Sequence, residues 1–454
     1  MAQAPRSHDI DMLHGPLVPK IIAFALPVAA SGFLQQLFNA ADVAVVGRFA
    51  GSDALAAVGA NTYLVSLMVN LFVGVSLGAN VTIANYVGEG DERGVSRATH
   101  TAIALSLVCG IMLAIGGQLL ARLVHEAIGT PEELLKQALL YFRVYYLGMP
   151  AIMLYNFASA VLRSKGDTRR PLVVLIISGV LNVLLNVLFV VGLKLDVAGV
   201  ALATVLSNVV SGLALVEMLR RETGAYHLSL RNLRIDRKSL ASIVRVGLPA
   251  GVQSSVFSLS NIVLQTAINS LGQTAMAATT VASNFEYFTY NAILGFSQAG
   301  TTFVSQNDGA GNQERCRRVT RLTLLLGPVF TLGVGLFFYV LRVPFVGFFT
   351  TDAAVKPLAY QRILRATCFQ WVNAINEIFS GALRGYKLSV VPASISIIGI
   401  CGTRVLWVHT GFVALPTYAH LVLAYPISWA VTAVAQGVAY ALVMHGKGRN
   451  QSVA

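Results

Sequence analysis

The sequence predicts an all-α protein that crosses a membrane many times, and three observations lead to this prediction. Of 454 residues, 55% are hydrophobic and only 12% are charged, whereas soluble globular proteins carry about 25% charged residues. Apolar runs of about 20 residues, the length that a bilayer demands, recur along the whole chain. Period-two alternation over ten-residue units is absent, which favours helices over a transmembrane barrel.

Cuts at charged and Gly/Pro-rich breaks divide the chain into twelve predicted spans. Each span is long enough to cross a bilayer, and several would have to tilt or project beyond it. The first sixteen residues are polar and contain Pro5 and Pro16, so we expect no cleavable signal peptide, and the first span must direct insertion. The spans are residues 18–46, 54–86, 99–121, 138–162, 172–193, 197–219, 246–270, 275–305, 322–343, 362–383, 389–410 and 418–444.

The distribution of Lys and Arg predicts that both termini are cytoplasmic. With that orientation, 23 of the 33 basic residues fall on the cytoplasmic side and 10 on or near the outer side. Residues 220–245 form the most basic and longest polar loop, and they are the predicted linker between an N-lobe (18–219) and a C-lobe (246–444). Residues 1–17 and 445–454 are the predicted cytoplasmic tails of a multi-pass protein of the cell inner membrane.

The two halves repeat each other. Three pairs of segments share one offset of 221 residues: 51–60 with 272–281, 85–97 with 306–318, and 159–171 with 380–392. Random apolar similarity would not keep one register over this length. The sequence therefore predicts two pseudo-symmetric six-helix lobes in parallel orientation, as in transporters that alternate access around a central site.

Several other functions are disfavoured by the sequence. The net charge of +13 comes from basic residues in short loops, without the basic face that nucleic acid requires. The Gly-rich loops lack a Lys-Ser/Thr and follow no strand, so they are not phosphate loops, and no histidine pattern matches a metal site. We therefore expect no cofactor, and energy from an ion gradient. The isolated cysteines are expected to be small buried residues: Cys109, Cys316, Cys368 and Cys401.

Long segments of both halves resemble the multidrug and toxic compound extrusion (MATE) family of secondary transporters, and within it the prokaryotic branch that includes the DinF-type proteins. This resemblance implies twelve helices in two lobes, a V-shaped central cavity, and export of substrates against an inward flow of Na⁺ or H⁺. The segments that carry it are FNAADVAVVGRFAGSDALAAVG, VGEGDERG with NDGAGN, LRSKGDTRRP, LNVLLNVLFVVGLKLDVAGVALATVLSN and SGALRG.

Asp42 is the main candidate for the coupling chemistry, because an acid inside an apolar span is costly and marks function by default. At 1.5 Å per residue, Asp42 lies about 9 Å from the end of its span, and Asn186 and Thr204 lie about 12 Å from theirs. Asn182 precedes Asn186 by one helical turn. A carboxylate with amide and hydroxyl oxygens suits Na⁺, and the same carboxylate could take H⁺.

The resemblance implies that Asp42, Asn182, Asn186 and Thr204 line the N-lobe cation site. Some relatives carry a second acid where Asn186 stands, and its absence leaves sodium and proton coupling both open. The alternative is structural: Asn and Thr side chains often only bridge membrane helices, and Asp42 could pair with Arg48.

For the substrate, Gln35 and Phe38 share a helix face with Asp42, and Tyr155 shares a face with Ser159. A cavity with aromatic edges and one carboxylate favours lipophilic cations, although these residues could equally be core. Pro27 loosens the first helix, and we expect ion binding at Asp42 to be coupled to bending there; a static kink is the alternative.

The second half offers three charged candidates, Glu286, Glu377 and Arg404, with either a structural ion pair or a substrate or proton role. Glu377 precedes Arg384 by two turns, which predicts a separation too long for a direct local pair. A partnership of either acid with Arg404 is open. Relatives place an acid where Asn373 stands, so this lobe differs from theirs.

These observations predict a monomeric antiporter that exports organic, lipophilic cationic small molecules from a lipid bilayer. One alternative is an exporter or flippase of a lipid-linked precursor or metabolite, whose cavity should be rich in Lys and Arg. An integral-membrane enzyme would need a convergent His, Ser or metal constellation, which the sequence does not contain.

Overall fold

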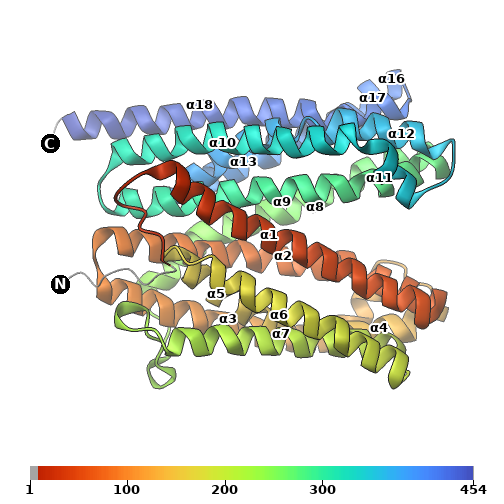
Figure 1. The fold of residues 1–454 in the computed structure, drawn as a ribbon, viewed down its shortest axis with the longest axis horizontal. Coiled ribbons are helices and arrows are strands. Elements are labelled where there is room, and N and C mark those ends of the chain that lie inside the picture. The colour runs from red at the N-terminus through yellow and green to blue at the C-terminus, as the bar shows by residue number, and fades with distance from the viewer. Residues whose placement is uncertain (1–8, 453–454) are drawn as a thin grey trace. The chain divides into compact units, whose positions relative to one another are not determined.

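The structure is a computed structural model that describes residues 9–452. Helices make up 87% of it, and the described residues contain no strand (Figure 1), which confirms the predicted all-α class. The helices longer than fifteen residues are α1 (Leu17–Phe49), α2 (Gly51–Glu89), α3 (Glu92–Ala127), α4 (Glu132–Leu147), α5 (Met149–Ser164), α6 (Arg169–Asn186), α7 (Asp196–Arg220), α8 (Arg237–Ser270), α9 (Gln273–Gly309), α10 (Gln313–Val340), α13 (Gln370–Gly385) and α18 (Ala424–Ser452).

Short helical segments complete several spans. Two π-helical segments continue α6 and α14 (Val390–Ser396): η1 (Val187–Gly192) and η5 (Ile397–Gly402), the latter leading into α15 (Thr403–His409). A third, η4 (Ile363–Thr367), follows α12 (Val355–Arg362) and precedes α13. The remaining elements are α11 (Arg342–Phe349), α16 (Gly411–Ala414), α17 (Tyr418–Val422), η2 (Gly224–Tyr226) and η3 (Leu230–Asn232).

Among the described residues, nine helices or joined helices are long and apolar enough to cross a membrane. The pair α4 and α5 passes the same test together and bends by 45° where they join, at Gly148 and shortly before Pro150, which lacks a backbone N–H. The two remaining predicted spans, 275–305 and 362–383, fall in α9 and in α12–η4–α13. The protein is therefore a multi-pass membrane protein.

Contacts divide the chain into two compact units. Of the described residues, Asp9, Ile10 and Ser31–Gly251 form unit 1, and Asp11–Ala30 and the residues from Val252 to Ser452 form unit 2. The boundaries differ from the predicted lobes (18–219 and 246–444) because α1 and α8 each pass from one unit to the other. Each helix contains an internal Leu-Pro pair, at Pro27 and Pro249, within four residues of that change.

Close packing explains which unit holds each helix end. In unit 2, Phe24 of α1 meets Phe303 of α9 edge to face, with ring centroids 5.9 Å apart. In unit 1, α8 lies against α2 so closely that a Cβ on Gly78 would fall 2.2 Å from the Ile243 carbonyl oxygen. Glycine is therefore required at this crossing, since any side chain would push the two backbones apart.

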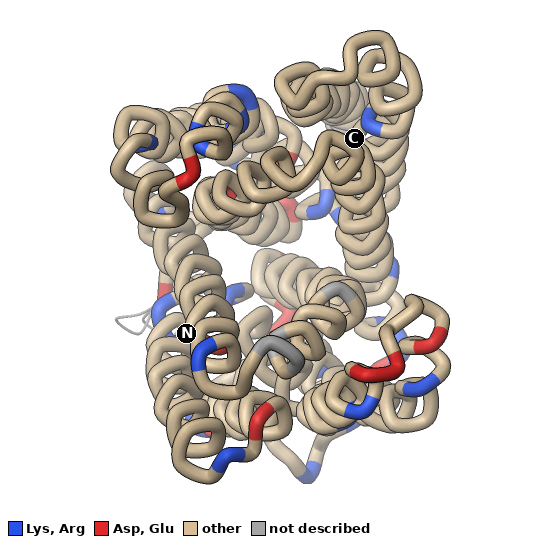
Figure 2. Tube along the Cα trace, turned by 90° about the vertical axis from the view of Figure 1, so that its right-hand side faces the viewer, with Lys and Arg blue, Asp and Glu red and all other residues tan. Residues whose placement is uncertain are grey.

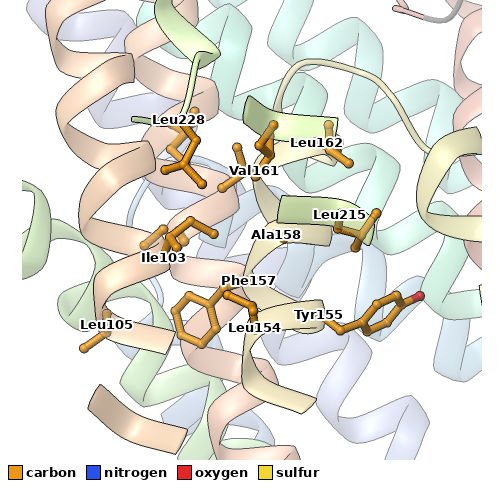
Figure 3. Packing of buried hydrophobic residues seen from close by; sticks show 14 of the residues in the cluster. Ile103, Leu105, Leu154, Tyr155, Phe157, Ala158, Val161, Leu162, Leu215 and Leu228 are labelled. Atoms are coloured by element: carbon orange, nitrogen blue, oxygen red, sulfur yellow. The ribbon is translucent and has the colours of Figure 1, made fainter. Parts of the chain in front are cut away.

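The core of unit 1 is a cluster of buried apolar side chains contributed mainly by α2, α3, α5 and α7. Figure 3 shows part of it, with Tyr155 beside Leu154 and Leu215. The predicted linker, 220–245, is docked on this cluster: Leu228 is buried in it, and the Ser229 and Asp236 amides donate to α3 side chains at 3.1 and 3.0 Å. A matching cluster in unit 2 includes residues of α9, α12 and α18.

Charged residues occupy few positions along the trace (Figure 2). One buried group lies beside the loop between α5 and α6, where Lys165 contacts both Asp9 and Glu222 at 3.0 Å. Arg170 contacts Glu222 at 2.5 Å and also pairs with Asp167. Burial would raise the pKa of Glu222, but the hydrogen bonds from Arg170 and Lys165 outweigh it and hold that pKa below its usual range.

Candidate cation site

Three helices of unit 1 bring the four predicted cation-site residues together. The Asn186 amide of α6 donates to Asp42 of α1, with 2.5 Å between Nδ2 and Oδ1. The Thr204 hydroxyl of α7 lies 3.5 Å from the other Asp42 oxygen, and the Asn182 amide lies 3.4 Å from that hydroxyl. Asn186 also donates to Asn182 at 3.3 Å, which closes the ring of contacts.

The local backbone explains how α6 presents both amides to Asp42. Asn182 and Asn186 are four residues apart and therefore lie on one helix face. Immediately after Asn186 the helix widens into the π-helical segment η1, a feature found frequently at functional sites. Asn208 of α7 repeats the spacing, but its side-chain amide donates to the Thr204 carbonyl at 2.8 Å and to no other described residue, so it stands outside this group.

The polar group contains one carboxylate and no counter-charge. Among the ion pairs of the described residues, none involves Asp42, so the structure shows no pair with Arg48. Asn186 is fully buried, and its Oδ1 accepts no hydrogen bond from any residue that the structure describes. An anionic carboxylate beside an unpaired amide oxygen is a donor set that fits a monovalent cation, because such ions prefer oxygen ligands and need one compensating charge.

Two tyrosines that the sequence analysis missed stand near this group. Tyr141 and Tyr145 of α4 stack with their ring centroids 5.9 Å apart, and both lie close enough to Asp42 to interact with it electrostatically. Tyr141 packs with Val46 of α1 in one buried cluster. Their spacing of four residues inside a predicted span was the signal that could have identified them.

The structure places the predicted substrate residues in two different settings. Gln35 is exposed, and Phe38 packs so tightly on α6 that a Cβ on Gly179 would lie 1.8 Å from its ring. Tyr155 and Ser159 are buried in the core, where the Tyr155 hydroxyl donates to the Pro171 carbonyl at 3.4 Å. A substrate role for these four residues, and a bending role for Pro27, stay predictions.

The charged candidates of unit 2 have partners that the sequence did not predict. Glu286 pairs with Arg362 through two contacts of 2.6 and 3.0 Å. The expectation that Glu377 lies too far from Arg384 is wrong, because Arg384 Nη1 lies 3.9 Å from Glu377 Oε2. Arg404 donates to Asn261 and Ser428, and among the described residues it pairs with neither acid.

Comparison with known proteins identifies the family of both halves of the chain. The MatE family model matches residues 27–188 and 249–408, one match in each half of the chain. The chain is 29% identical to a probable multidrug resistance protein NorM of Thermotoga maritima, over 85% of this chain and 83% of that protein. It is 26% identical to an FAD transporter of Shewanella oneidensis, over 92% and 93% of the two chains.

A solved structure described as MATE in complex with MaL6 has the same fold, with a TM-score of 0.91 and 22% identity over 98% of this chain and 100% of that one. The fold is therefore the one in which twelve helices form two lobes. The family's members are transporters of small molecules rather than enzymes. Since the family model matches most of both halves, this chain belongs to the MATE family of membrane transporters.

Proposed function

We propose that this protein is a secondary active antiporter that exports organic, lipophilic cationic compounds in exchange for Na⁺ or H⁺. One observation carries the proposal: Asp42 is a carboxylate in a membrane-spanning helix, held by Asn186 and without a basic partner among the described residues. A carboxylate in a bilayer costs several kcal/mol unless a cation or proton compensates its charge. A reversible binding site for the coupling ion supplies that compensation.

The residues around Asp42 would divide the work of ion binding. Asp42 supplies the negative charge, Asn186 orients the carboxylate through its N–H and offers its unpaired Oδ1 to the ion, and Asn182 and Thr204 complete the oxygen set. The one carboxylate suits a single monovalent cation or one proton. We infer no resident cofactor, a monomer, and an inner-membrane location with both termini cytoplasmic.

The helix that carries Asp42 would also transmit ion binding. Proline at position 27 removes one helical hydrogen bond, and α1 changes units four residues later. Because α1 is weakened at Pro27, it can bend there when ion binding draws the part of α1 that carries Asp42 toward α6 and α7. Gln35 and Phe38 lie on the Asp42 face of the same helix, so substrate contact and ion occupancy would act on one element.

The name of one relative supports a second candidate, export of a metabolite. The FAD transporter of Shewanella oneidensis matches 92% of this chain. An anionic metabolite would need basic residues rather than Asp42 at its binding surface. The two candidates therefore differ in the charge of the exported compound.

Transport by the protein in liposomes tests the proposal. A fluorescent organic cation, and separately FAD, is followed under an imposed Na⁺ or H⁺ gradient. We expect gradient-driven export of the cation by the wild type and by Glu126→Gln, which neutralises an exposed acid, and loss of export in Asp42→Asn. Asp42→Asn with wild-type transport would disprove the role of Asp42, and export of FAD alone would favour the second candidate.

A further inference from the structure

Unit 2 contains a buried arginine that the proposed cation site does not use. Arg404 of α15 is 0% exposed. It donates to Asn261 of α8 at 2.7 Å and to Ser428 of α18 at 3.3 Å. Its guanidinium also lies 4.8 Å from the ring centroids of Phe257 and Tyr425, a favourable position over the aromatic faces. The side chain is thus held in place by two other helices.

The charges around Arg404 do not balance. Among the described residues, the acid and the base that act on it electrostatically are Glu286 and Arg362. Glu286 is engaged by Arg362, itself 2% exposed, through the two short contacts described above, and Arg362 also donates to the Tyr425 hydroxyl at 3.1 Å. One carboxylate therefore faces two guanidinium groups, and the group carries an excess of one positive charge in a membrane-spanning region.

One donor of Arg404 is also unused. Its Nη2 is buried and has no hydrogen-bond acceptor among the described residues. Aromatic faces lower the energy of a cation but do not neutralise it, and a buried donor without an acceptor is costly in its own right. A single negative charge that accepts hydrogen bonds would correct both the charge balance and the unused donor.

We propose that a small monovalent anion, of the size of chloride, binds at the Nη2 edge of Arg404 between α8, α15 and α18. Its single charge matches the excess of one. Arg404 is completely buried, so an anion reaches Nη2 only when the side chains packed around it move apart. A halide requires the smallest movement, which favours it over a nucleotide or a lipid headgroup. The site goes beyond the proposed antiport and does not depend on it, because Arg404 belongs to unit 2 and Asp42 to unit 1.

Thermal unfolding of the purified protein tests the anion site without any transport measurement. Chloride is titrated against gluconate at constant Na⁺ and ionic strength. We expect a saturable rise of Tm with chloride in the wild type and in the control Arg342→Gln, which removes another arginine that lies over tyrosine rings in unit 2. Arg404→Gln should show no chloride response. Equal Tm values of the wild type in the two salts, or a retained response in Arg404→Gln, would overturn the proposal.

Two measurements keep the proposal testable if Arg404→Gln does not fold. Glu286→Gln raises the excess positive charge to two, so chloride should bind at least about tenfold more tightly. A chloride concentration at the midpoint of the Tm response that is equal to or higher than that of the wild type counts against the site. Wild-type crystals grown in bromide should show an anomalous peak in contact with Arg404 Nη2. The absence of that peak at a bromide concentration that saturates the Tm response would overturn the proposal.

Discussion

Replacement of Asn186 by Leu measures how much the amide contributes to ion binding at Asp42. The substitution keeps a buried side chain of similar size but removes two groups of Asn186. One is the Nδ2 donor, 2.5 Å from Asp42 Oδ1, and the other is Oδ1, which accepts no hydrogen bond from the described residues. A hydrogen bond to a charged group contributes about 1.5–3 kcal/mol. At about 1.4 kcal/mol per factor of ten, loss of this bond corresponds to a change of about 10- to 150-fold in the apparent proton affinity of Asp42.

The direction of the change distinguishes the two coupling ions. Sodium would lose the Asn186 Oδ1 as a ligand, so the half-saturating Na⁺ concentration should rise in Asn186→Leu. Loss of the N–H bond favours the protonated carboxylate over the charged one, so a proton-coupled carrier should be half-saturated at a proton concentration lower by this factor. The assay is export of a fluorescent cation from proteoliposomes at graded external Na⁺ or pH.

Asn208→Leu is the matched control, since Asn208 lies one turn beyond Thr204 and its amide bonds only to the helix backbone. We expect its half-saturating ion concentration to stay within about threefold of the wild type, because no hydrogen bond to a charge is lost. If Asn186→Leu and Asn208→Leu gave the same value as the wild type, the proposed contribution of Asn186 would be refuted.

Two further predictions concern packing and charge. Gly179→Ala should destabilise the protein by about 1–3 kcal/mol and impair ion-driven export, because its Cβ would lie 1.8 Å from the Phe38 ring. Gly192→Ala is the control and should leave stability unchanged, because a Cβ on Gly192 would lie 3.7 Å from its nearest neighbour. Equal Tm values of the two variants would contradict the packing argument. Glu222→Gln should cost about 1.5–3 kcal/mol at pH 7, since Lys165 and Arg170 lose their charged hydrogen-bond acceptor at Glu222 but keep Asp9 and Asp167. Because the pKa of Glu222 is lowered, this stabilisation is present above its unfolded value and is lost as the pH falls through the folded value; thermal unfolding of both proteins from pH 7 to pH 3 should show the difference vanish.

The positions of Asp42, Asn186 and Thr204 illustrate how far sequence reasoning reached. Their depths follow from a helical rise that is the same in every α-helix, so distance from a span's end could be estimated without a structure. The common helix face of Asn182 and Asn186 follows from the same regularity. Depth does not say which helices are neighbours, and only the structure shows α1, α6 and α7 in contact through these side chains.

The charged residues of the second half show the opposite case. The sequence offered Glu286 and Glu377 as partners of Arg404, but Arg362, near a span's end and unremarked, is the residue that pairs with Glu286. The choice among several basic residues depends on how α9, α12 and α15 are rotated about their axes. That rotation comes from side-chain packing between helices, which no local pattern contains.

The sequence by itself determined the all-α membrane class, the duplicated halves, the family and the residues of the candidate cation site. The membrane class and the duplication follow from composition, hydropathy and spacing, which act over one helix or one repeat at a time. The family follows from the segments that resemble it, and the candidate site residues follow from that resemblance together with their depths in the spans. The tertiary structure decided that α1 and α8 each divide between two compact units, that Tyr141 and Tyr145 stand near Asp42, and that no acid among the described residues pairs with Arg404. The physical reason is that these contacts join residues of different helices, and their partners are selected by close packing of whole helices rather than by any local preference.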